Sequence, residues 1–441
     1  SSSMISIGNG RYRISSTWTA NASASGNLAF ALSNADSTTI TSWTATGTES
    51  IFIWGAQLEI RSTATAYTAT TTQAITNYIP VLQTAASGVA RFDNNPTTGE
   101  SLGLLIEESR TNIDTYSSDA TNWVTNAITV QSNVNVSPDG TQTADCLVST
   151  AVSAAHYVYP LASSITTSTV YTYSVHAKAN GLNYLFLQGN DGGGAYPKTF
   201  FNLSNGTIAT GGSGYTNSIT SVGNGWYRCS ITFTSSGTTS SLLAMGISDT
   251  TNQTSTGNGF SGVFVWGAQL EAGAFATSYI PTVASQVTRA ADAASMTGTN
   301  FSSWYNAGEG TLYAEAVSFG ASSNTFSISD GTSSNWIYLI SRQNAVSASG
   351  AVVNANGTTQ ASLGSFTFST TNKIALGYKA NDFGASVNSA TVITDTSGII
   401  PITNAAYLGA RGDGFSSSQT IKKIAYYPLK VSSANLQALT S

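Results

Sequence analysis

An internal repeat constrains this chain more than any other feature of its sequence. Residues 8–13 (GNGRYR) recur at 223–228 as GNGWYR, and residues 54–59 (WGAQLE) recur unchanged at 266–271. The second glycine and the tryptophan lie 44 residues apart in the first copy and 41 apart in the second. A loop insertion between equivalent strands would produce that difference. Two such matches in the same order indicate a duplicated folding module.

The repeated segments have the pattern of β-strands. An Asn-Gly pair, which tolerates the positive φ of a tight turn, precedes the run at 226–234. From Tyr227 to Phe233 this run alternates apolar and polar residues, which predicts a half-buried strand. Residues 262–270 are apolar on both faces, as expected of an inner strand of a sandwich.

The composition favours the same fold class. Of 441 residues, 41% are hydrophobic but only 8% are charged, and Ser, Thr, Asn, Gly and Ala fill the difference. Thr and aromatic residues favour strands, whereas Ser, Asn and Gly favour turns and weaken helices. We therefore predict an all-β protein of tandem jelly-roll or β-sandwich modules joined by a β-hairpin connector.

The repeat and the turn signals divide the chain into four parts. We expect the C-terminal part of a jelly-roll module at 1–67, a connector with a β-hairpin at 68–116, a complete jelly roll at 117–284 and a further β-sandwich at 285–441. The first copy lacks upstream strands. Either the chain is a fragment of a longer protein, which we favour, or another chain completes that sheet.

Charge and hydropathy exclude several partners. The net charge is −5 and no run of Lys or Arg occurs, so we expect neither nucleic acid nor an anionic membrane surface as a partner. No stretch approaches the ~20 apolar residues that span a bilayer, so we expect no membrane insertion. The first ten residues lack the pattern of a signal peptide.

Several segments resemble known protein families. Residues 90–93 (ARFD) and 103–112 (GLLIEESRTN) resemble segments of tailed-bacteriophage virion proteins such as tail fibres. The module at 117–284, from the PDGT segment at 138–141 to its WGAQLE motif, is similar to carbohydrate-binding-module jelly rolls. The module at 285–441, which ends in IAYYPL and a short helix signal, resembles concanavalin-A/laminin-G-like sandwiches.

The resemblance implies a phage virion appendage on the virion surface, hence extracellular, that displays glycan-binding sandwiches for host attachment. Its partners would be host-surface glycans and other virion proteins. Fibrous virion proteins are commonly homotrimers, so the resemblance also implies a homo-oligomer, although no coiled-coil heptad supports a trimer. The alternatives are a purely structural virion component that decorates or cements the particle without binding sugar and, third, a polysaccharide depolymerase.

Aromatic side chains are the best candidates for a sugar platform, because flat rings stack on pyranose rings. We expect Trp226 to point away from the core, since its neighbour Tyr227 faces inward, and to form an exposed platform. Its alternative role is packing against a loop or a subunit. The remaining candidate glycan-binding residues in this module are Tyr184, Tyr196 and Tyr215.

We predict no catalytic residue, metal site or cofactor, and hence no enzyme. Glu107, Glu108 and Arg110 form a dense charge cluster, but adjacent residues on a strand face opposite sides, so we interpret them as solvated charges. Two cysteines, Cys146 and Cys229, are expected to be buried free thiols, with a disulfide as the alternative.

Calcium is the one ion that the lectin resemblance suggests. Lectins of the concanavalin type often bind calcium through clustered acidic and Asn side chains. Asp382, Asp395 and Asp413 are instead scattered among loops, so the sequence gives a structural calcium no support.

Overall fold

The structure is a computed structural model that divides into two compact units, Ser1–Tyr78 and Ile79–Ser441. In the first unit, β1 (Ser2–Gly8) and β2 (Arg11–Ser16) pair as an antiparallel hairpin. The first-copy strand expected at 54–59 lies mostly outside the described residues, and so does most of the module expected at 1–67. The described residues are 2–8, 11–17, 53, 56, 58, 80–86, 88–161, 164–189, 196–238, 243–320, 322–343, 348–367 and 369–441.

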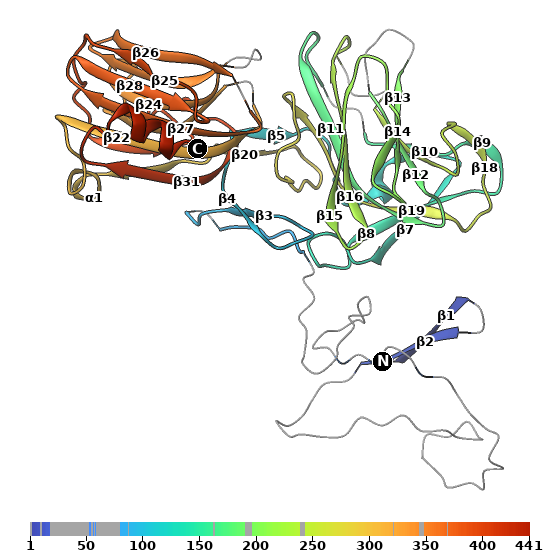
Figure 1. The fold of residues 1–441 in the computed structure, drawn as a ribbon. Coiled ribbons are helices and arrows are strands. Elements are labelled where there is room, and N and C mark those ends of the chain that lie inside the picture. Colours follow the sequence, from blue (N-terminus) through green and yellow to red (C-terminus); the bar gives the residue numbers. More distant parts are fainter. Residues whose placement is uncertain are drawn as a thin grey trace, which may run out of the picture. The chain divides into compact units, whose positions relative to one another are not determined.

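The described chain is nearly all β, which confirms the predicted fold class (Figure 1). The second unit holds two sandwiches, and their strands pair antiparallel. The first sandwich and its 3-10 helix consist of η1 (Ala120–Asn122), β6 (Val124–Asn126), β7 (Ile128–Asn135), β8 (Ala144–Ser149), β9 (Ser153–Ala155), β10 (Tyr157–Tyr159), β11 (Val170–Asn180), β12 (Tyr184–Gln188), β13 (Lys198–Asn202), β14 (Thr207–Thr210), β15 (Thr216–Gly223), β16 (Trp226–Thr234), β17 (Ala244–Ser248), β18 (Thr254–Thr256) and β19 (Gly262–Ala272).

This first sandwich has two six-stranded sheets. One, which we call sheet D, has the order β14-β13-β12-β17-β10-β6. The other, which we call sheet E, has the order β15-β16-β11-β19-β8-β7. The repeat segments supply β16 and β19, which flank the central strand β11. Cys229 and Ile231 on β16 are fully buried in the core between the sheets, as the alternating pattern predicted. The Asn224-Gly225 turn that precedes β16 has positive φ at both residues.

The second sandwich has its core between a six-stranded and a seven-stranded sheet. Their orders are β21-β30-β23-β24-β25-β26 and β29-β28-β27-β22-β31-β4-β3. The elements from β20 onward are β20 (Val287–Arg289), β21 (Ala294–Thr297), α1 (Thr299–Ser302), β22 (Glu309–Ser318), β23 (Ser323–Ser329), β24 (Trp336–Gln343), β25 (Ala348–Ala355), β26 (Thr358–Thr367), β27 (Thr371–Lys379), β28 (Asp382–Val387), β29 (Ile393–Asp395), β30 (Ala405–Leu408), β31 (Gln419–Tyr427) and α2 (Ser433–Leu439).

The hairpin of the connector belongs to the second sandwich. β3 (Phe92–Asn94) pairs with β4 (Ser101–Ile106), and β4 pairs in turn with β31 of the seven-stranded sheet. The next segment, β5 (Arg110–Asn112), pairs with β20. The second sandwich therefore takes strands from both sides of the first sandwich in the sequence.

A close approach at Gly103 makes this docking possible. Gly103 has φ +121°, and a Cβ added there would lie 2.3 Å from the carbonyl oxygen of Ile421 on β31. At Gly88, φ is also positive (+80°), but an added Cβ would meet no atom within 4 Å. The close contact of β4 with β31 thus depends on a residue without a side chain.

We predict that Gly103→Ala destabilises the second sandwich more than Gly88→Ala does. Both substitutions carry the backbone cost of positive φ, ~1–2 kcal/mol, but only Gly103→Ala also forces β4 away from β31, which adds ~1–3 kcal/mol. Thermal unfolding of the full chain measures the difference. Equal melting temperatures for the two variants would contradict the docking of β4.

Candidate functional site

The outer side of sheet D carries a cluster of aromatic residues. Alternate residues of its strands, such as Leu185, Leu187 and Phe201, belong to the core between the sheets. Successive side chains of a strand point to opposite faces. Their neighbours therefore point to the other side of sheet D, which we call the aromatic face; its residues are Tyr157, Tyr159, Tyr184, Phe186, Gln188, Lys198, Phe200 and Asn202.

Four strands align their residues in one row across the aromatic face. Tyr157 lies opposite Gly246, Gly246 opposite Phe186, and Phe186 opposite Phe200. The rings of Phe186 and Phe200 are 5.3 Å apart, and those of Tyr157 and Tyr159 are 6.2 Å apart. Phe186 and Phe200 are buried whereas the tyrosines are half-buried, so the phenylalanines form the floor and the tyrosines the accessible rings.

Gly246 makes room for this row. A Cβ added to Gly246 would lie 2.1 Å from the Cζ atom of Phe186, so the Phe186 ring covers the glycine. A side chain at that position would displace the ring. The absence of a side chain on β17 is therefore what lets the aromatic residues of β10, β12 and β13 form one surface.

Polar groups that can bond hydroxyls flank the aromatic row. Tyr184 lies opposite Asn202 on one side and Ser248 on the other, and Gln188 lies opposite Lys198. Burial lowers the pKa of the Lys198 ammonium, which donates to the carbonyl of Tyr196 at 3.1 Å. A surface that combines half-buried tyrosine rings with amides can stack on a sugar ring and hydrogen-bond its hydroxyls.

The structure does not bring the four predicted binding residues together. Tyr184 lies on the aromatic face, and Tyr196 is half-buried two residues before β13. Tyr215 packs against the core, with its ring 5.8 Å from that of Phe233. Trp226 lies on sheet E, the opposite sheet.

The prediction that Trp226 is exposed is wrong. Trp226 points away from the core, as the alternation indicated, but it is only 2% exposed because other segments cover that side of sheet E. It packs with Trp266 and Tyr279, and its indole N–H donates to the Val136 carbonyl at 3.2 Å. Its alternative role, packing, is the one that the structure supports.

The WGAQLE motif of β19 holds a following segment against sheet E. The Gln269 side chain accepts from the Ile280 amide at 2.7 Å, and Glu271 accepts from the amide and the hydroxyl of Thr277 at 2.8 and 2.7 Å. Arg228 donates to the Thr277 carbonyl at 2.6 Å. The Gln269, Glu271 and Thr277 side chains are buried and Arg228 is half-buried, so the motif has a structural role.

Sequence analysis missed this role, although a signal was present. The segment held by the motif, TSYIP at 277–281, matches TNYIP at 76–80, and each is followed by an arginine and an aspartate. These are Arg91 with Asp93 in one copy and Arg289 with Asp292 in the other. The repeat therefore extends past the strands into the connecting segments.

Arg91 and Arg289 meet at one buried carboxylate, that of Glu107. Arg91 Nη1 lies 2.6 Å and Arg289 Nη1 3.0 Å from Glu107 Oε2, while the Ser278 amide donates to Oε1 at 2.7 Å. Asp292 also pairs with Arg91. Glu107 is 3% exposed. The interpretation of Glu107 and Arg110 as solvated charges is therefore wrong, because both are buried; Glu108 is half-buried and pairs with Arg110.

The electrostatics of this cluster are those of a structural ion-pair network. Burial opposes ionisation of Glu107, but Arg289, the Ser278 amide and Arg91 outweigh it, so the pKa of the Glu107 carboxyl lies below its ordinary value. A carboxylate held in its charged form does not serve as a proton donor. The cluster thus holds the connector in place.

The remaining reactive groups are buried. Cys146 and Cys229 are free buried thiols, which confirms that interpretation over a disulfide. Burial and the charge of Arg228 lower the pKa of His176 to about 3, so its imidazole is neutral. Within the described ranges, no group of three or more His, Cys, Asp or Glu side chains could hold a metal ion.

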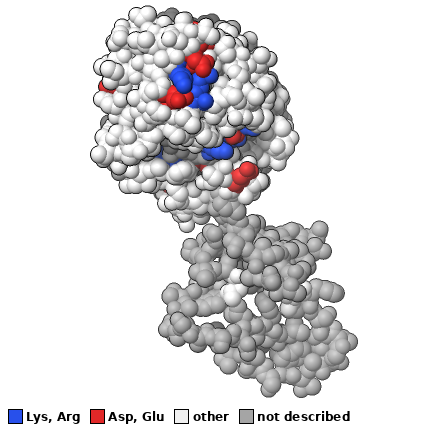
Figure 2. Space-filling view, turned by 60° about the vertical axis from the view of Figure 1, so that its left-hand side comes forward, with Lys and Arg blue, Asp and Glu red and all other residues white. Residues whose placement is uncertain are grey.

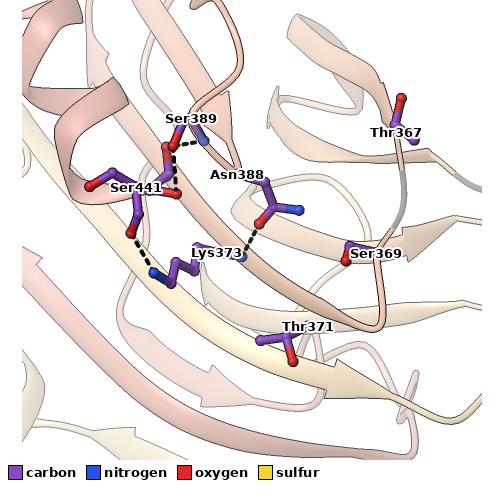
Figure 3. A pocket seen from close by; sticks show the side chains of 8 residues that line it. Thr367, Ser369, Thr371, Lys373, Asn388, Ser389 and Ser441 are labelled. Atoms are coloured by element: carbon purple, nitrogen blue, oxygen red, sulfur yellow. Dashed lines mark hydrogen bonds between the residues drawn. The ribbon is translucent and has the colours of Figure 1, made fainter.

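An open hollow of about 580 Å³ on the second sandwich is lined by polar side chains (Figure 3). Lys373 donates to the Ser441 carbonyl, and the Asn388 side chain accepts from the Lys373 amide at 2.9 Å. Ser389 donates to the Thr440 carbonyl at 3.4 Å. Several of the lining groups are thus bonded to one another, and the hollow has no aromatic platform.

Comparisons of the sequence with protein families and with curated proteins give no match. No protein-family model matches the chain, and neither does any curated protein.

Among the helices that the structure describes, none has the length and apolar character needed to cross a membrane.

Three solved structures illustrate a general likeness to the chain. The CBM40 module of the Ruminococcus gnavus IT-sialidase, bound to α2,3-sialyllactose, is 14% identical over 31% of this chain and 84% of its own, with a TM-score of 0.27. Domains LG4-5 of the mouse laminin α1 chain are 7% identical, covering 59% and 83%, with a TM-score of 0.23. The GH43 protein BlXynB of Bacillus licheniformis is 9% identical, covering 66% and 73%, with a TM-score of 0.21. Such low scores transfer neither a site nor a ligand.

A buried carboxyl group gives a prediction on pH. Asp114 is fully buried, no hydrogen-bond partner for its carboxylate oxygens is found among the described residues, and burial raises its pKa from 3.8 to about 7. The folded state therefore holds this proton more tightly than the unfolded state. The contribution of Asp114 to the free energy of unfolding is fully present below about pH 4. It is lost as the pH rises through about 7, at up to ~1.4 kcal/mol per pH unit.

We expect Asp114→Asn to remove this dependence. The variant should resemble the wild type near pH 4 and melt at a higher temperature than the wild type at pH 8. Calorimetric scans across that range measure the gap, with Asp249→Asn, at an exposed position, as the control. A constant difference between Asp114→Asn and the wild type would refute the assignment.

Proposed function

We propose that residues 117–284 form a non-enzymatic glycan-binding module whose binding surface is the aromatic face of sheet D. The single observation that carries this proposal is the row formed by Tyr157, Gly246, Phe186 and Phe200, flanked by Tyr184 and by amide side chains. Buried phenylalanines hold the floor rigid, so half-buried tyrosines can stack on a sugar without a large loss of side-chain entropy.

The charge of the aromatic face favours a largely uncharged saccharide. Lys198 is the single ionisable Lys, Arg, Asp or Glu among the eight residues that define the face. Recognition would therefore rest on ring stacking and on hydrogen bonds from half-buried side chains such as the Asn202 amide. Binding of that kind is insensitive to salt, because few charges are neutralised.

We further propose that the chain acts as a phage virion appendage that attaches to host-surface glycans. Support comes from the resemblance of residues 90–93 and 103–112 to segments of tailed-phage virion proteins. Position on the virion surface, contact with other virion proteins and a homotrimeric state remain predictions. The second candidate is a purely structural virion component, which would bury aromatic rings such as Trp226 between subunits; Trp226 and Trp266 are instead covered by segments of the same chain.

Polysaccharide cleavage has less support. A retaining or inverting glycosidase needs two carboxyl groups, one of them with a raised pKa, on either side of the bond that breaks. Glu107 and Asp292 lie near each other, but Arg91 binds both, and the pKa of Glu107 is lowered. This pair does not supply the proton donor that the reaction requires.

We predict that the full chain binds a bacterial surface polysaccharide and that Tyr184→Ala weakens binding at least about tenfold, equivalent to ~1.4 kcal/mol. Asn202→Ala should weaken binding in the same direction. The control is Phe260→Ala, which removes a ring that is 75% exposed on the same sandwich but lies outside the aromatic face. Glycan arrays and calorimetric titration measure the affinities.

Two outcomes would contradict the proposal. Equal affinity of Tyr184→Ala, Phe260→Ala and the wild type would place binding elsewhere than the aromatic face. A folded chain that binds no glycan on a broad panel would favour the purely structural component.

A further inference from the structure

Half of one strand edge is open in the seven-stranded sheet. β31 pairs with β22 along its whole length on one side. On the other side it pairs with β4 over Gln419–Ile421 only, and no described strand pairs with residues 422–427 there. An open edge presents unpaired main-chain N–H and C=O groups to another strand.

A mainly apolar cavity of about 410 Å³, whose lining also includes the Arg91–Asp292 ion pair, lies beside this open edge. Val89 and Leu104 from the connector line it together with Met296, Trp304 and Ile424 of the second sandwich. Val89 is 59% exposed, Met296 45% and Ile424 42%, so much of this apolar surface faces solvent. Exposed apolar surface beside an open strand edge is typical of an interaction site.

The connector hairpin offers surface features that complement the cavity and the edge. β3 is the outermost strand of the same sheet, and Phe92 on it is 64% exposed. The hairpin also carries the half-buried Asp93 and the exposed Glu100, whereas the open edge carries Lys422 and Lys423, both exposed. Within the same chain Lys422 lies 3.9 Å from Glu315, and Lys423 lies over the Tyr313 ring. Only 8% of the chain is charged, and Lys, Arg, Asp and Glu gather in a few small patches on the face drawn in Figure 2. Because charged residues are rare, opposite charges on the hairpin and on the open edge would make the contact between them selective.

We propose that the chain self-associates, with the β3–β4 hairpin of a second copy docked on the cavity and on residues 422–427 of β31. Phe92 of the second copy fills the cavity, and its Asp93 and Glu100 face Lys422 and Lys423. Each copy carries both the hairpin and the receiving edge, so two copies form the contact reciprocally as a dimer, in place of the trimer that the resemblance implies. The hairpin lies beside its own cavity but leaves Phe92 exposed, so this ring is available to the cavity of another molecule.

Charge reversal of the full chain tests this interface. One variant carries Asp93→Lys and Glu100→Lys, and the other carries Lys422→Glu and Lys423→Glu. Each variant alone places like charges across both contacts, whereas a mixture of the two restores opposite charges in both. Sedimentation velocity should show assemblies for the wild type and for the mixture, and single chains for each variant alone.

A second variant removes the apolar part of the contact. Phe92→Ser should dissociate the assembly, whereas the matched control Phe260→Ser, at a position 75% exposed on the first sandwich, should not. Both positions are exposed, so unchanged melting temperatures are expected and show that each variant folds.

Three results would overturn the interface. The first is that the wild type sediments as single chains at every concentration. The second is that the charge variants assemble as the wild type does, and the third is that the mixture stays dissociated. Glycan binding is measured in a separate experiment. Failure of the sedimentation test therefore does not contradict the aromatic face as a binding surface, and failure of the glycan test does not contradict this interface.

Discussion

The second unit depends on the burial of one carboxylate, that of Glu107. Two arginines from the two copies of the connecting segment converge on it, and the Ser278 amide donates to its other oxygen. Removing one partner of a buried ion pair typically costs ~3–5 kcal/mol, because the other charge is left unpaired. Glu107 therefore ties β4, which completes the second sandwich, to the segment that covers sheet E of the first.

The functional proposal builds on this connection. Sheet E is covered by the segment that Gln269 and Glu271 hold, so its outer side is closed. Sheet D keeps an outer side with half-buried tyrosines, and Gly246 lets its aromatic residues form one surface. The two sheets of this sandwich thus have different roles. Sheet E attaches the module to the rest of the chain, and the outer side of sheet D is available for a ligand.

Local pattern predicted the strands well but not what covers them. Alternation placed Cys229 and Ile231 in the core, and it placed Trp226 on the opposite side of the strand. It could not show that Trp226 is covered, because the covering residues Val136 and Tyr279 lie far away in the sequence. Glu107 was misread for the same reason, since Ser278 and Arg289 lie more than a hundred residues downstream. The matched YIP segments were the available signal, because a repeat that extends into connecting segments indicates that those segments have a structural role.

Hydrogen exchange of backbone amides in the full chain tests the role of Glu107 most directly. The account predicts that Glu107→Gln speeds exchange at Ser278 and along β20, while β11 stays protected. Glu108→Gln, at the neighbouring half-buried position, should leave all these rates close to those of the wild type. Equal exchange at Ser278 and β20 in both variants would contradict the claim that the Glu107 carboxylate holds the two sandwiches together.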